Sequence, residues 1–267
     1  EMEFNRLLSS AISAYGEPNL DVKKVETTFE ENQIEIDKKN YQLIKDAKEI
    51  DDWIKEAEEV GEVAVDTETD SLDPHQANLV GISLSSKISK ACYIPIGHKS
   101  NNCLDKNVVL KKLKPLLEDP SIKKIGQNIK FDFIVLYKHG INISSMEDTM
   151  LMSYVLDAGK NRHNMDTLSE IHLKHKTISF KDLVGSGKKE INFSEVNVEK
   201  AKDYAAEDSD ITFRLYKKFY KNLKEEKMTN IYELFEKPMI KILAFMEIEG
   251  IKIDNKFLKL LSNKFEK

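Results

Sequence analysis

AVDTETDSLDP, residues 64–74, decides the fold, because it continues an apolar β-like run into two closely spaced carboxylates. Asp66 and Glu68 stand two positions apart, so on an extended strand both side chains point to the same face. Carboxylate oxygens are the ligands that hard divalent cations prefer. The stretch therefore predicts a buried strand that ends in half of a metal site, suited to metal-assisted phosphodiester chemistry.

Chance alone also produces such pairs, since Asp and Glu make up 46 of the 267 residues. The simpler interpretation of the pair is a solvated strand end. The apolar residues 63–65 favour the buried strand instead, and two further acidic motifs downstream favour a site.

The second motif, GQNIKFDF, places Asn128 and Asp132 four residues apart at the start of a stretch with a helical apolar pattern. This spacing stacks both side chains on one side of a helix. In the alternative interpretation, Asn128 caps the helix and Asp132 is solvated in the first turn, where the helix dipole favours an anion.

The third motif, DYAAEDSDITFRLY, places Tyr204 and Asp208 four apart on a strongly helical stretch with recurring apolar positions. An aspartate on the inner face of this helix is costly to bury unpaired. Metal coordination would remove that cost, and so would a salt bridge to Lys or Arg. Glu207 and Asp210 carry no such constraint and are expected to face water.

The composition allows a sizeable core and a very polar surface, with 40% hydrophobic and 33% charged residues. A net charge of −5 argues against a globally basic nucleic-acid binder. It does not exclude DNA binding, because cations at a carboxylate site offset negative charge. The two cysteines give no disulfide framework, and no run reaches transmembrane length, so we expect a cytoplasmic protein.

The order of predicted elements indicates a mixed α/β sheet with helices on both faces. Residues 10–40 read as a linker, and the chain beyond residue 138 is mostly helical. Between these we expect a helix at 47–60, strands near 62–67, 79–85 and 91–96, a helix at 106–118, a strand at 123–127 and a helix at 129–138.

The three motifs DTETDSLDP, NIKFD and YAAED resemble the exonuclease motifs of the DEDD superfamily, and the tyrosine in the last one marks its DEDDy branch. Further stretches, among them KIGQNIKFD and DTMLMSYVLDAG, are similar to the proofreading 3′–5′ exonuclease domain of bacterial family A DNA polymerase I. The resemblance covers about residues 45–225. It implies a ribonuclease H-like fold, with a mixed five-stranded sheet flanked by helices and a helical C-terminal extension.

The resemblance also implies the chemistry. Asp66 would bridge two Mg²⁺ or Mn²⁺ ions, with Zn²⁺ as an alternative at the first site. Glu68 and Asp208 would complete that first site, and Asp132 would hold the second ion. Tyr204 would orient the attacking water. The product would be a deoxynucleoside 5′-monophosphate released from a single-stranded or frayed 3′ end of DNA.

Substrate contacts follow from the same resemblance. It implies a wedge against the terminal bases, a packing surface for the nucleotide and polar contacts to sugar or phosphate. The alternative for the two apolar members is plain core packing. The wedge is assigned to Leu72, the packing surface to Phe180, and the polar contacts to Thr67, Gln127, Asn128 and Arg162. The family often has a tyrosine beside the second motif where this chain has Phe131, so a hydroxyl contact is lost there.

The flanking residues resemble neighbouring parts of the same polymerase, so we expect an internal piece of a larger enzyme. Residues 1–40 are expected to be a linker after a 5′-nuclease domain, residues 41–225 the exonuclease domain, and residues 226–267 the truncated start of the polymerase thumb region. The partners would then be DNA and the polymerase and 5′-nuclease domains of the parent chain, with no membrane.

Two alternatives stay open. One is a DEDD exoribonuclease of the RNase D type, which DTETDSLDP and the thumb-like tail argue against. The other is a catalytically inactive domain that only supports a polymerase, which the presence of all four carboxylates and the tyrosine argues against.

Overall fold

The computed structural model of the chain describes residues 13, 38–100, 103–187 and 190–266. The chain divides after residue 34, and the second unit is Glu35–Lys267. The expected linker at residues 1–40 therefore lies almost wholly outside the described residues. All elements described below belong to the second unit.

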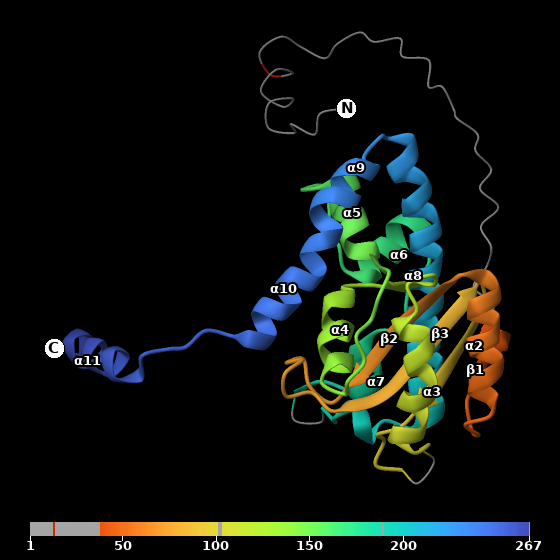
Figure 1. Ribbon diagram of the computed structural model, residues 1–267, viewed down its shortest axis with the longest axis horizontal. Helices are drawn as coiled ribbons and strands as arrows, with labels where there is room; N and C mark the ends of the chain where they lie inside the picture. Colours follow the sequence, from red (N-terminus) through yellow and green to blue (C-terminus); the bar gives the residue numbers. More distant parts are fainter. Residues whose placement is uncertain (1–12, 14–37, 101–102, 188–189, 267) are drawn as a thin grey trace. The chain divides into compact units, whose positions relative to one another are not determined.

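Within the described residues, six strands form one mixed sheet in the order β1-β4-β3-β2-β5-β6, of which Figure 1 labels β1, β2 and β3. Strands β2, β3 and β4 are antiparallel neighbours, whereas β1 runs parallel to β4, β5 to β2 and β6 to β5. The predicted mixed sheet is confirmed, but it has six strands and not five. The strands are β1 Tyr41–Leu43, β2 Glu62–Thr69, β3 Leu79–Lys87, β4 Lys90–Pro95, β5 Lys123–Gly126 and β6 Met146–Asp148.

Helices occupy most of the remaining chain, and the predicted helical C-terminal extension is present. The helices are α2 Glu49–Val60, α3 Lys106–Glu118, α4 Ile129–Tyr137, α5 Thr149–Asp157, α6 Met165–Leu173, α7 Phe180–Val184, α8 Val198–Glu225, α9 Thr229–Ile231, α10 Lys237–Glu249 and α11 Asn255–Phe265. The 3₁₀ turns η1 Lys38–Asn40 and η3 Phe193–Glu195 and the π-helical turn η4 Tyr232–Glu236 complete the set. Among the described helices, none combines the length and the apolar character needed to cross a bilayer.

Successive side chains of β2 point to opposite faces of the sheet and so enter two different cores. Val63 and Val65 belong to the core that α2, α3 and α4 close on one face. Ala64 belongs to the core that α5, α6 and α8 close on the other. Because alternation continues to the end of the strand, Asp66 and Glu68 turn toward α8.

The prediction for two carboxylates of α8 is wrong. Glu207 and Asp210, which were expected to face water, are completely buried. The expectation treated α8 as a helix with one inner face, but α8 packs on β1 to β5 and also on α5, α6 and α7, so it is enclosed on several sides. Each buried charge has opposite-charge partners, Lys38 for Glu207 and Arg214 for Asp210, as burial of a charge requires.

Candidate active site

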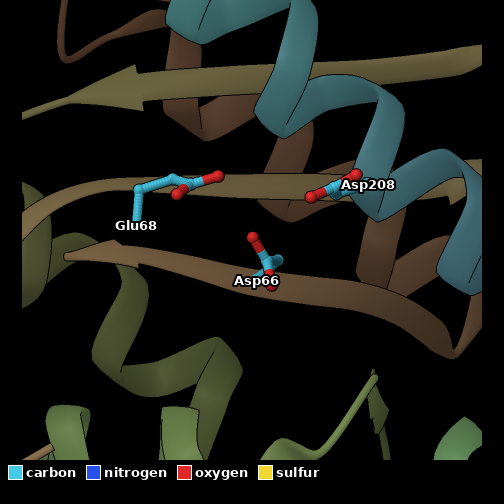
Figure 2. Close-up of side chains that lie close together, drawn as sticks. All are labelled: Asp66, Glu68 and Asp208. Carbon is cyan, nitrogen blue, oxygen red and sulfur yellow. The ribbon is translucent and has the colours of Figure 1, made fainter. Parts of the chain in front are cut away.

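Three carboxylates meet where the end of β2 faces the middle of α8. Asp66, Glu68 and Asp208 each place one carboxylate oxygen within 4.8 Å of the others. Figure 2 shows the three side chains directed toward a common point, two from the strand and one from the helix. Residues 140 positions apart in sequence thus form one acidic cluster, which β2 alternation and the inward face of α8 bring about.

The cluster has the properties of a cation site. Glu68 and Asp208 are each 7% exposed, and the Glu68 Oε1 atom is buried with no hydrogen-bond partner. No ion pair joins these three carboxylates to Lys, Arg or His within the described ranges, so the salt bridge considered for Asp208 is absent there. An unpaired buried carboxylate is costly, and a divalent cation with oxygen ligands would remove the cost.

Burial raises the pKa of all three carboxyl groups, and repulsion between the charges adds to the rise at Glu68 and Asp208. Desolvation raises the pKa of Asp66 to about 6. Desolvation is also the main reason that the pKa values of Glu68 and Asp208 lie well above their usual range, and the charge of Asp66 adds to it. A hydrogen bond from Tyr204 partly offsets the rise at Asp208. The cluster resists full ionisation unless positive charge is supplied.

Asp132 lies on α4 and contacts β2 through Thr67. Its Oδ1 atom accepts hydrogen bonds from the Thr67 backbone N–H at 2.9 Å and from the Thr67 hydroxyl at 2.6 Å. Asp132 is 3% exposed, so its interpretation as a solvated first-turn residue is wrong. Burial, followed by the charge of Asp66, raises the pKa of Asp132, and the two Thr67 bonds lower it.

The start of α4 depends on Asp148, which lies in the stretch DTMLMSYVLDAG but was not a candidate site residue. Asn128 has a left-handed backbone, with φ of 62°, and makes no side-chain cap, so the capping interpretation is wrong. The N–H groups of Asn128 and Ile129 instead donate to the buried Asp148 carboxylate at 3.1 and 3.0 Å. Asp148 also caps α5. Two sequence signals point to it, its place at the start of DTMLMSYVLDAG and its position directly before the helical pattern of α5.

A cavity of about 460 Å³ opens over the acidic cluster. Besides the three carboxylates, Thr67, Leu72, Phe180 and Tyr204 line it, all of which were candidates from sequence. Leu72 is 92% exposed and Phe180 is 42% exposed, so neither is a core residue. The cavity therefore joins the acidic cluster to exposed apolar side chains, as a site for a nucleotide requires.

Aromatic rings form one wall of this cavity. Phe180 is stacked on Phe193, with ring centroids 6.2 Å apart and planes 4° from parallel. Phe180 also meets the ring of Tyr204 edge-on at 6.0 Å. Phe193, which lies in η3 and belongs to no motif, was not a candidate from sequence. Burial and the nearby carboxylates raise the pKa of Tyr204, so its phenol stays protonated.

Three of the candidates for substrate contacts do not line the cavity. The Gln127 amide donates to the His163 carbonyl at 2.7 Å and accepts from the Thr149 hydroxyl at 2.5 Å. Arg162 is exposed in the connection between α5 and α6. Asn128 is half-buried at the start of α4.

Known proteins are similar to this chain in both sequence and fold. A family model described as 3′-5′ exonuclease matches residues 41–224. DNA polymerase I of Rhizobium leguminosarum is 42% identical over 243 residues, which cover 83% of this chain and 24% of that protein. The chain thus spans about a quarter of the length of the curated relatives that it matches.

Two solved structures show the same fold. Brucella melitensis NrnC with bound Mg²⁺ has a TM-score of 0.54 and 26% identity, over 80% of this chain and 92% of that one. Escherichia coli RNase D has a TM-score of 0.56 and 18% identity, over 77% of this chain and 50% of that one, which shows the ribonuclease H-like fold alone. The chain belongs to the 3′–5′ exonuclease family of DNA polymerase I.

Proposed function

We propose that this domain removes nucleotides from the 3′ end of DNA as the proofreading part of a DNA polymerase I, in replication and repair. The observation that carries the proposal is the cluster of Asp66, Glu68 and Asp208, with its unpartnered Glu68 Oε1 atom beneath an aromatic-walled cavity. The family match and the polymerase I relatives support the same assignment.

The proposed cofactors are two divalent cations, Mg²⁺ or Mn²⁺, with Zn²⁺ as an alternative at the first site. Asp66, Glu68 and Asp208 would hold the first cation, and Asp132 would take part in holding the second. Bound cations stabilise the attacking and leaving oxygens of an in-line displacement and make water a nucleophile near neutral pH. The Mg²⁺ bound to Brucella melitensis NrnC supports a metal in this fold.

The chain's own residues would fix the reacting groups. Tyr204 stands one helical turn before Asp208 and, because its phenol stays protonated, would orient water and not remove a proton. Asp132 is held in place by the two Thr67 bonds and cannot swing away. Such fixed geometry lowers the entropic cost of reaching the transition state.

The exposed apolar residues would bind the end of the DNA strand. Phe180, supported by Phe193, offers a stacking surface that tolerates every base, as a proofreader requires. Leu72 would act as the wedge against the terminal bases, and Thr67 would contact the sugar or phosphate. A mismatched 3′ end frays at lower cost, so it would reach the site more often. The contacts of Gln127, Asn128 and Arg162 to sugar or phosphate stay predictions. Because these residues do not line the cavity, they would meet the DNA strand outside it.

The polymerase and 5′-nuclease domains are proposed as partners in the same parent chain, because the relatives are full polymerases of which this chain matches about a quarter. The boundaries at residues 40 and 225 and the cytoplasmic location are proposals of the same kind.

The test is hydrolysis of a 5′-labelled single-stranded DNA oligonucleotide with Mg²⁺ or Mn²⁺. We expect stepwise shortening from the 3′ end with release of 5′-monophosphates, lost in Asp208→Ala. Asp203→Ala is the matched control, since Asp203 lies on the same helix and pairs with its neighbour Lys202 at the surface. Preferential hydrolysis of RNA would favour the RNase D alternative, and no hydrolysis of either would favour the inactive domain.

A further inference from the structure

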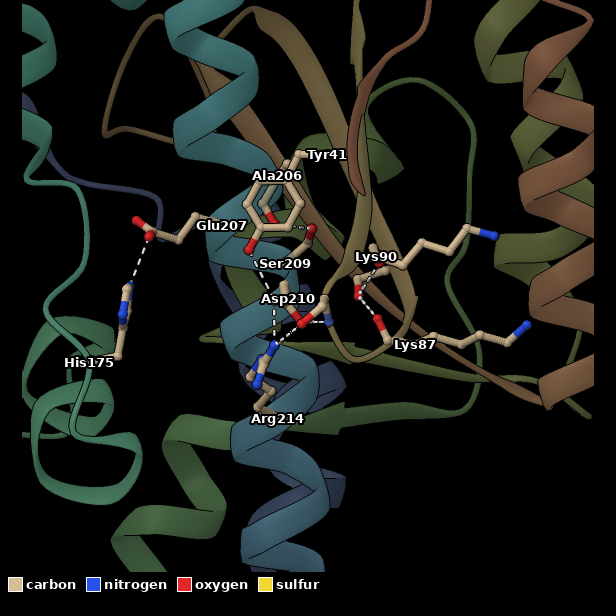
Figure 3. A network of polar contacts seen from close by, with 11 residues as sticks. Tyr41, Lys87, Lys90, His175, Ala206, Glu207, Ser209, Asp210 and Arg214 are labelled. Carbon is tan, nitrogen blue, oxygen red and sulfur yellow. Dashed lines mark hydrogen bonds and ion pairs between the residues drawn. The ribbon is translucent and has the colours of Figure 1, made fainter. Parts of the chain in front are cut away.

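Glu207 is a completely buried carboxylate next to Asp208 that the proposed chemistry does not use. Its Oε1 atom accepts from His175 Nε2 at 2.9 Å and pairs with Lys38 Nζ at 2.7 Å, and its Oε2 atom accepts from the Ile178 N–H at 2.6 Å. Figure 3 shows the bond between His175 and Glu207, which reaches from α8 to a separate segment of the chain. A carboxylate cannot donate, so His175 carries its proton on Nε2 here.

His175 and Ile178 belong to residues 174–179, the connection from α6 to α7. Other hydrogen bonds tie this connection to α6, from the Thr177 hydroxyl to Asp166 and from the Ser169 hydroxyl to the His175 carbonyl. Glu207 ties it to α8, the helix that carries Tyr204 and Asp208.

Phe180 follows this connection directly. It is the first residue of α7 and lies two positions after Ile178. Its ring contacts Phe193 and Tyr204 at the cavity wall. The Ile178 bond therefore anchors the backbone within two residues of the proposed stacking surface, and a loss of that anchor would let Phe180 move relative to the acidic cluster.

We propose that Glu207 is a positioning residue, which holds residues 174–179 on α8 and thereby fixes Phe180 for binding of the terminal nucleotide. The inference rests on the proposed function, because it takes Phe180 as part of the nucleotide site. Glu207 lies outside the cluster of Asp66, Glu68 and Asp208 and does not line the cavity. It acts on substrate affinity, whereas Asp208 next to it acts on the chemical step.

Asp210 is the matched control on the same helix. It is also completely buried and accepts from the Tyr41 hydroxyl and the Ser89 N–H, both at 2.9 Å, and from the Arg214 guanidinium. These partners lie on β1, in the turn between β3 and β4 and on α8 itself, and none of them is among the residues that line the cavity. We therefore expect that removing the charge of Asp210 disturbs α8 but leaves residues 174–179 bound to it.

The kinetic test compares Glu207→Gln and Asp210→Asn in the full chain, with single-stranded DNA and Mg²⁺. We expect Glu207→Gln to raise KM about 5- to 20-fold with kcat within about twofold, as for loss of one stacking contact. Phe180→Ala should act in the same way, and the double variant should be no worse than Phe180→Ala alone. Asp210→Asn should leave KM within about twofold. An unchanged KM in Glu207→Gln, or a fall in kcat alone, would overturn the inference.

His175→Ala provides a milder variant if Glu207→Gln does not fold, and we expect a smaller rise in KM from it. Hydrogen exchange of residues 174–180 without DNA supplies a readout independent of activity. Faster exchange at Ile178 is expected in Glu207→Gln and His175→Ala but not in Asp210→Asn. Unchanged exchange overturns the positioning role even if KM rises. If the proposed function itself were wrong, the result would be different: hydrolysis would survive Asp208→Ala.

Discussion

Thr67 donates two hydrogen bonds to one oxygen of Asp132, which joins the strand that carries Asp66 and Glu68 to the helix that carries Asp132. One bond comes from the backbone, so it survives any side-chain change, and the other comes from the hydroxyl. These two bonds thus connect two motifs that lie 65 positions apart in sequence.

Thr67→Val removes the hydroxyl bond and keeps the shape. We expect a loss of about 1–3 kcal/mol in the free energy of unfolding, because a buried carboxylate loses a charge-assisted hydrogen bond. We also expect slower hydrolysis from looser placement of Asp132. Thr67→Ser is the control, since it keeps the hydroxyl. Urea unfolding measures the first effect, and equal stability of the two variants would be inconsistent with this role.

Asp148→Ala should destabilise the protein by about 2–4 kcal/mol, because backbone N–H groups at the starts of α4 and α5 lose their buried acceptor. Asp148→Asn keeps an acceptor oxygen and should cost less. The comparison is made by urea unfolding at pH 7. If Asp148→Ala were as stable as the unchanged protein, the assignment of Asp148 as the shared cap would fail.

Without divalent cations, the acidic cluster should weaken the fold as pH rises. The pKa of Asp66 is about 6 in the folded chain, above its ordinary value of 3.8, so the unfolded chain gives up its proton first. The penalty is therefore absent below about pH 4 and complete above the folded pKa. In EDTA, Asp66→Asn should be more stable than the unchanged protein by about 1–3 kcal/mol at pH 7.5 and equal to it near pH 4. A variant that is less stable at pH 7.5 would contradict the direction of the shift.

Leu72→Ala should separate binding of a duplex end from hydrolysis. Leu72 is 92% exposed, so its truncation should change the free energy of unfolding by less than about 0.5 kcal/mol. Hydrolysis of a duplex with a mismatched 3′ end should slow by about 3- to 10-fold, because the wedge no longer separates the terminal bases. Single-stranded DNA needs no separation, so its hydrolysis serves as the control. Equal slowing on both substrates would argue against a wedge.

The sequence predicts the elements around the site better than the edges of the sheet. Strands β2 to β5 have enough residues to show a pattern, whereas β1 and β6 have three residues each and show none. Asp66 and Glu68 follow from alternation along β2, and Tyr204 and Asp208 from the face of α8. Which distant segments pair as neighbouring strands leaves no pattern in the local sequence.

Residues fixed by tertiary contacts are the ones that sequence patterns do not reveal. Glu207 and Asp210 look solvated on a helical pattern, and their burial depends on Lys38, His175 and Arg214, which come together only in the fold. Phe193 reaches the cavity from a 3₁₀ turn for the same reason.

The most direct measurement of the central claim is the anomalous density of a crystal soaked in Mn²⁺. We expect a peak in contact with carboxylate oxygens of Asp66, Glu68 and Asp208, and its loss in Asp208→Asn but not in Asp203→Asn. No peak at these three carboxylates, or a peak that survives Asp208→Asn unchanged, would contradict the assignment of this cluster as the metal centre of the exonuclease.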